Sequence, residues 1–166
     1  MPRRIVLVGL VAAVAVVVAV VSTALATPSS GVTAETARGE LTAPLHVNRE
    51  FDNGARVKLK TSGPIELVAQ RIVAEPGATF GWHHHPGENV NVVLQGTLTL
   101  YHDEACTVGI DYPAGKAFST SPNQIHLAKN NGSTPLILYA TYFMPKTTPP
   151  TPVRVDEPLP APGCPQ

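Results

Sequence analysis

The chain has 166 residues with 12 basic and 12 acidic side chains, so its formal net charge is zero. A neutral chain gives no electrostatic case for binding nucleic acid or an anionic membrane surface, and we expect no nucleic-acid partner. The length is enough for one hydrophobic core and shows no internal repeat, which indicates a single folded domain.

Residues 1–26 have the composition of an export signal. Arg3 and Arg4 form a short basic region, residues 5–21 are almost entirely Val, Ala and Leu, and Ala24-Leu25-Ala26 fits the small-residue rule for cleavage. The apolar run is also close to the length that spans a bilayer, so an uncleaved N-terminal membrane anchor is the alternative. We therefore expect a hydrophobic signal helix and a secreted or cell-envelope protein, with a membrane partner only if this segment is retained.

Residues 27–44 are mostly small and polar, which favours a flexible linker. Beyond them, short aliphatic and β-branched runs alternate with turn sequences rich in Gly, Pro and Asn. These runs are 57–59, 67–73, 90–94, 98–100 and 136–143. No convincing amphipathic helix separates them, so residues 45–145 are predicted to form an all-β domain, a single antiparallel β-barrel or jelly roll.

The sequence His83-His84-His85 is the strongest chemical signal. Side chains alternate along a strand, so His83 and His85 point to the same face and His84 to the other. A catalytic metal usually takes at least three protein ligands, and His126, with apolar neighbours, is the best third candidate. The three histidines predict a site for a divalent metal ion; hydrogen-bonded core histidines are the alternative. Because imidazoles must be neutral to bind metal, affinity should fall near pH 6.5.

The spacing around these histidines resembles the cupin superfamily. Its first motif, G-x5-H-x-H-x3,4-E-x6-G, is matched by Gly77, His83, His85 and Gly96, but Asn89 stands where the family has glutamate. Of the second motif, Pro113-Ala114-Gly115 and His126-x3-Asn130 are present. The resemblance implies a jelly-roll barrel that binds Fe, Mn, Cu, Ni or Zn and a small-molecule ligand or substrate, and a possible homodimer. It also implies a fourth ligand, Asn89 or, alternatively, Glu88.

Residues 146–166 contain repeated prolines, which favour an extended tail without regular hydrogen bonding. Cys106 and Cys164 are the only cysteines, an even number in a chain with an export signal. We expect a disulfide between them that fastens the tail to the domain, with two free thiols as the alternative.

Two functions fit these features. The first is an exported metal-dependent, dioxygenase-like enzyme acting on a small organic substrate, in which Glu88 is a candidate general base. The second is a non-enzymatic module that binds a small ligand or a metal. A barrel with purely structural histidines and a metal-free ligand site is a third reading. The sequence shows no arginine clamp at a recognisable spacing, which slightly favours binding over turnover.

Overall fold

The computed structural model describes residues 26–166, in which every regular element is a β-strand apart from one turn of 3-10 helix at Asp103–Ala105. The predicted signal segment lies, except for Ala26, outside the described residues. Within 26–166, no helix has the length and apolar character needed to cross a membrane. The strands are β1 (Ser30–Glu40), β2 (His46–Glu50), β3 (Arg56–Lys60), β4 (Ile65–His84), β5 (Glu88–Gln95), β6 (Thr97–His102), β7 (Ile110–Pro113), β8 (Ala117–Thr120), β9 (His126–Lys129), β10 (Leu136–Pro145) and β11 (Val155–Asp156).

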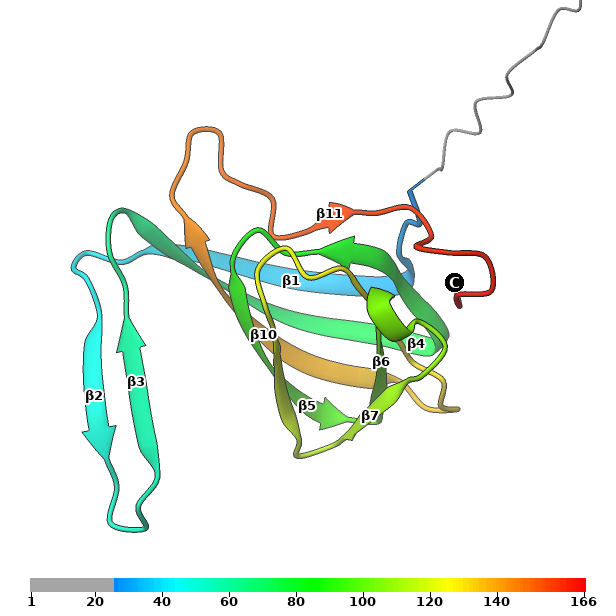
Figure 1. The fold of residues 1–166 in the computed structure, drawn as a ribbon, viewed down its shortest axis with the longest axis horizontal. Helices are drawn as coiled ribbons and strands as arrows, with labels where there is room; N and C mark the ends of the chain where they lie inside the picture. Colours follow the sequence, from blue (N-terminus) through cyan, green and yellow to red (C-terminus); the bar gives the residue numbers. More distant parts are fainter. Residues whose placement is uncertain (1–25) are drawn as a thin grey trace, which may run out of the picture.

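Strand β4 is long enough to contribute to both walls of the barrel (Figure 1). Its first half, from Ile65 to Ala74, pairs with β1 and β10, whereas its second half, from Thr79 to His84, pairs with β9 and β11. Gly77 lies between these halves and has a φ value of 77°, and Gly81 lies within the second half and has a φ value of 68°. Such positive φ values favour glycine and let the strand change direction between the walls.

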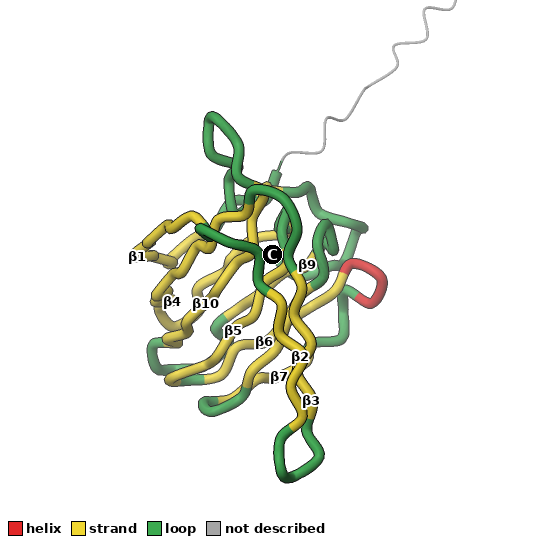
Figure 2. The backbone as a smooth tube through the Cα atoms, turned by 90° about the vertical axis from the view of Figure 1, so that its left-hand side faces the viewer, coloured by secondary structure: helices red, strands yellow, loops and turns green. Residues whose placement is uncertain are grey.

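The remaining strands extend each wall. One wall runs β1, β4, β10, β5, β8, and the other runs β11, β4, β9, β6, β7, all antiparallel where they pair. Figure 2 shows β1, β4, β10 and β5 side by side. The apolar core lies between the walls. Strand β10 shows the alternation that builds it, because Leu136, Leu138, Ala140, Tyr142 and Met144 are all buried. The all-β, antiparallel barrel prediction is confirmed.

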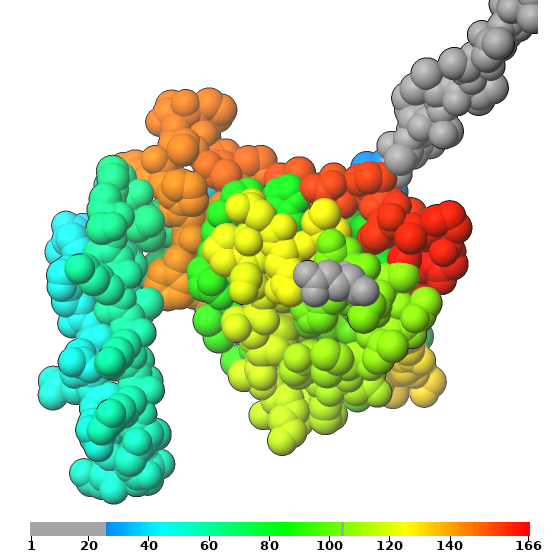
Figure 3. Space-filling view, viewed as in Figure 1, coloured from blue at the N-terminus to red at the C-terminus, as the bar shows by residue number. Residues whose placement is uncertain are grey.

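Two N-terminal segments differ from the sequence-based expectation. Within the expected linker 27–44, Ser30–Glu40 forms β1, which pairs with β4 over nearly its whole length. Small polar side chains are compatible with a strand at this position, because an edge strand is held through backbone hydrogen bonds and its outer face meets solvent. Strands β2 and β3, expected within the barrel, form a separate two-stranded hairpin that projects from it (Figure 3).

The proline-rich tail, residues 146–166, wraps back over the barrel, and we call it the C-terminal strap. Its β11 pairs with His83 and His84, and the indole nitrogen of Trp82 donates a hydrogen bond to the carbonyl of Pro165 (2.8 Å). The predicted disulfide between Cys106 and Cys164 is confirmed, with a Cα–Cα distance of 5.2 Å. The strap is thus joined to the barrel both covalently and through an added strand.

Candidate metal centre

The structure brings together the three histidines that the sequence predicts as metal ligands. His83 lies near the end of β4, His85 follows that strand directly, and His126 opens β9, where it is the register partner of His83. All three side chains are buried, and their ring centroids lie 4.3 to 5.1 Å apart. One nitrogen from each lies within 4.8 Å of the others, close enough for a shared ion.

Backbone carbonyls fix which imidazole nitrogen is available. The Nδ1 atom of His83 lies 2.7 Å from the carbonyl oxygen of Gly81, that of His85 lies 2.5 Å from Val153 O, and that of His126 lies 2.8 Å from Gln124 O. Carbonyl oxygens only accept hydrogen bonds, so each neutral ring carries its proton on Nδ1 and leaves the lone pair on Nε2. Metal-binding histidines in proteins are held in this way, and the three residues therefore fit a divalent ion.

Burial keeps the cluster neutral. Desolvation lowers the pKa of His85 to about 4 and that of His126 to about 3. The pKa of His83 is also lowered well below its usual value, first by burial and then by the charge of His126. Neutral imidazole is the form that ligates metal, so the site is ready for an ion across the neutral and mildly acidic range.

The histidines open onto a cavity of about 150 Å³ between the two walls. Much of its lining is aliphatic or aromatic; the polar residues beside the three histidines are Gln70, Asn89, Asn91, Tyr142 and Arg154. None of the lining residues, all within the described part of the chain, is Asp or Glu. Burial raises the pKa of Tyr142, so its hydroxyl remains protonated. A cavity of this volume is comparable to one that holds a benzene-sized molecule.

Asn89 lines this cavity, but its side-chain oxygen is already in use. It accepts hydrogen bonds from the Thr120 amide (3.1 Å), the Thr120 hydroxyl (2.9 Å) and the Asn91 amide (3.1 Å). The backbone N–H of Thr120 can only donate, so the atom of Asn89 that faces it must be the side-chain oxygen. The side-chain nitrogen of Asn89 is then the remaining group, and it is a poor metal ligand. This geometry makes Asn89 a residue that joins β5 to β8 and weighs against its expected role as fourth ligand.

Glu88 does not reach the site. It alternates with Asn89 along β5 and is exposed, and it is absent from the cavity lining. The structure therefore offers no support for Glu88 as a fourth ligand or a general base. The phase of a strand decides this outcome, because neighbouring residues face opposite sides and only Asn89 points inward.

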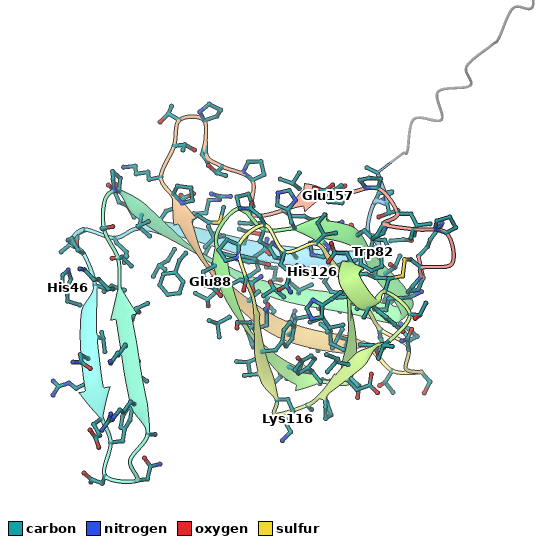
Figure 4. All side chains as sticks on the ribbon, viewed as in Figure 1. His46, Trp82, Glu88, Lys116, His126 and Glu157 are labelled. Atoms are coloured by element: carbon teal, nitrogen blue, oxygen red, sulfur yellow. A yellow bond between two sulfur atoms is a disulfide. The ribbon has the colours of Figure 1, made fainter. Side chains whose placement is uncertain are left out.

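The other histidines are not among the three whose ring nitrogens converge, although His102 is the register partner of His126 on the neighbouring strand β6. The Nδ1 atom of His84 lies 2.7 Å from a carboxylate oxygen of Glu157 on the strap, and His102 ends β6. Figure 4 shows His126 inside the barrel and His46 on the projecting β2–β3 hairpin.

Sequence reasoning missed two contributions of the strap. The carbonyl of Val153 orients His85, and the guanidinium of Arg154 lines the cavity. Both residues lie more than 25 positions after His126, outside any motif. The only signal that pointed toward them was the cysteine pair, which indicated that the tail returns to the barrel.

Fold and site together define a small antiparallel β-barrel protein with a candidate three-histidine metal centre in its interior. Residues 70–142 match the family model described as a Cupin domain. This matched stretch carries all three histidines and agrees with the cupin motifs found in the sequence. No curated protein matches the chain.

Several solved structures are similar. A protein with a double-stranded β-helix domain from Klebsiella pneumoniae is 22% identical over 61% of this chain and 77% of its own, with a TM-score of 0.43. A Cupin 2 conserved barrel protein from Salinispora arenicola is 21% identical over 46% of this chain and 61% of its own (TM-score 0.41). An oxalate oxidase is 21% identical over 46% of this chain, which spans 41% of that protein (TM-score 0.42).

Proposed function

We propose that this cupin is an exported metalloprotein whose His83, His85 and His126 hold one divalent metal ion and whose cavity binds a small organic molecule at that ion. Two observations carry the proposal together: one ring nitrogen from each histidine lies within 4.8 Å of the others, and all three Nδ1 atoms are hydrogen-bonded to backbone carbonyls, which leaves the Nε2 lone pairs free. Imidazole ligands suit Fe, Cu, Ni and Zn, and Mn is the further candidate among cupins. Three protein ligands leave coordination positions for the organic molecule.

The chemistry we propose is that of a metal-dependent, dioxygenase-like enzyme. A redox-active metal in this centre would supply reactivity toward dioxygen. The chain's own residues provide a mostly apolar cavity, which limits the access of water. They also provide the protonated hydroxyl of Tyr142, and the ring centroid of this tyrosine lies 5.1 Å from that of His85. Among the described residues of the lining, no carboxylate is present to act as a base, which favours chemistry centred on the metal over hydrolysis by a general base.

The same lack of a carboxylate in the described lining supports a second candidate, a non-enzymatic cupin module that binds a small ligand or a metal without turnover. Oxygen consumption distinguishes the two. Enzymatic function requires consumption that depends on both metal and an added organic substrate, whereas the module would bind the ligand without product.

Export is supported by the Cys106–Cys164 disulfide, since such bonds persist in oxidising compartments. Whether residues 1–26 are cleaved or retained as a membrane anchor is tested by N-terminal sequencing of the exported protein. The possible homodimer is tested by light scattering coupled to size-exclusion chromatography.

Elemental analysis of protein purified without chelator tests the metal centre. We expect near-stoichiometric metal in the native protein and none in the His83→Ala variant. The matched control is His46→Ala, because His46 is exposed on the β2–β3 hairpin and its loss should leave the metal content unchanged. Equal metal content in the His83→Ala variant and the native protein would refute the ligand assignment.

A further inference from the structure

The C-terminal strap places one cationic side chain in the same cavity as the three histidines. Arg154 lines the cavity, and its Nε donates a hydrogen bond to a carboxylate oxygen of Asp156 at 2.6 Å. Its Nη2 atom is buried and has no hydrogen-bond partner among residues 26–166. Leaving a buried guanidinium nitrogen without a hydrogen-bond acceptor costs free energy. An oxygen acceptor from a bound molecule would remove this cost.

The electrostatic balance of the cavity points the same way. The positive charge of Arg154 acts on all three histidines and on Tyr142: it adds to the lowering of the histidine pKa values by burial, and it partly offsets the rise that burial causes in the pKa of Tyr142. No Asp or Glu among the described residues lines the cavity. A divalent ion on three neutral imidazoles would add two further positive charges beside this guanidinium. Like charges in a poorly solvated cavity repel strongly unless an anion lies between them.

We infer that the cavity takes a small organic carboxylate, with its oxygens placed between the metal centre and the Nη2 atom of Arg154. This inference rests on the proposed metal centre for one of the two contacts. The guanidinium fork matches a carboxylate in geometry as well as charge. The body of the acid is short and apolar, because the cavity measures about 150 Å³ and its remaining walls include Ile72, Leu98, Leu100, Phe118 and Leu138.

Propionate and propionamide form a suitable pair of probes, since they have nearly the same shape and differ in charge. The Co(II)-loaded full chain is titrated with each by calorimetry, with the visible absorption of Co(II) as a second readout. We expect propionate to bind at least about tenfold more tightly than propionamide. Arg154→Met should weaken propionate about 10- to 100-fold, the range for one charge-assisted hydrogen bond, and leave propionamide and the Co(II) content unchanged.

Two further variants complete the design. Arg154→Lys keeps the charge but loses the planar fork, so its affinity for propionate should lie between those of the native protein and Arg154→Met. Arg49→Met removes an arginine from the exposed face of β2 and should behave as the native protein does. An unchanged Co(II) content in each variant establishes that the barrel and the centre are intact.

Equal affinity for the acid and the amide, no binding of propionate, or native affinity in Arg154→Met would each overturn the inference. If the native protein held Co(II) in that case, the proposed metal centre would still stand. If the native protein held no Co(II), the proposed function would fail, and the inference would be decided on the metal-free protein. Propionate binding there that is lost in Arg154→Met would support the anion site, and no binding would overturn it.

Discussion

The buried histidines make the metal-free protein sensitive to acid. In the unfolded chain each imidazole titrates near 6.5, whereas in the folded protein the pKa is about 4 for His85 and about 3 for His126. Between these values the unfolded chain binds protons that the folded protein does not. The free energy of unfolding is therefore highest above pH 6.5 and falls as the pH is lowered toward 4.

The size of the effect follows from the linkage relation. At pH 5 the unfolded state gains about 2 kcal/mol from each of these two imidazoles, or about 4 kcal/mol together. His83 acts in the same direction, because its pKa is also lowered in the folded protein. A domain of this size is stable by about 5 to 15 kcal/mol, so the loss is a large share of the total.

Urea unfolding of chelator-treated protein at pH 7.5 and pH 5 measures this loss. Carboxylates elsewhere also respond to acid, so the comparison is with a His85→Gln/His126→Gln variant, in which the two titrating groups are gone. The variant should lose about 4 kcal/mol less than the native protein between the two pH values. His46→Gln, altered on the exposed hairpin, should show the native loss. The same pH dependence in the double variant and the native protein would refute the reasoning.

Three other outcomes are expected. Metal affinity should stay nearly constant from pH 7 to pH 5 and fall closer to pH 4, because His85 and His126 are neutral until then; a midpoint near 6.5 in a competition titration would contradict the structure. Replacing Cys106 and Cys164 by Ser opens a link across 58 residues and should cost about 4 kcal/mol in urea unfolding if the chain-entropy account holds, and it should weaken metal binding through the loosened strap. Asn89→Ala should lower stability by about 1 to 3 kcal/mol, since donors of β5 and β8 lose their acceptor, yet leave the metal content intact; lost metal would restore Asn89 as a ligand.

The barrel was predictable where side chains carry the pattern. The runs 67–73, 98–100 and 136–143 supply alternate residues to the core, whereas Val90, Val92 and Leu94 of β5 are exposed. The alternation in His83-His84-His85 correctly placed two imidazoles on one face. Strand β1 was missed because its pairing depends on backbone groups, which every sequence has, and its exposed polar residues show no pattern. Residues 46–60 form strands, but local sequence does not specify whether a hairpin joins the barrel or projects from it.

The three histidines of the candidate site were predictable from the sequence, but the residues around them were not. Motif spacing found His83, His85 and His126 because two of them share a strand and the third stands in the family's second motif. The family's glutamate position suggested Asn89 as a ligand, and only the hydrogen bonds to its oxygen showed that this atom is occupied. Val153 and Arg154 belong to a proline-rich segment whose local sequence predicts no contact with the barrel.

The strap explains why a segment without a hydrophobic core of its own matters to the site. Strand β11 adds to the wall that carries His83, the carbonyl of Val153 holds the ring of His85, and Arg154 lines the cavity. All three contacts depend on the strap lying in one place, and Cys164 anchors its far end to the barrel. Because extended proline-rich chain loses considerable conformational freedom when it is held, this covalent anchor lowers the entropy cost of keeping Val153 and Arg154 at the site. We therefore expect the reduced protein to retain the barrel but to bind metal more weakly at the proposed centre.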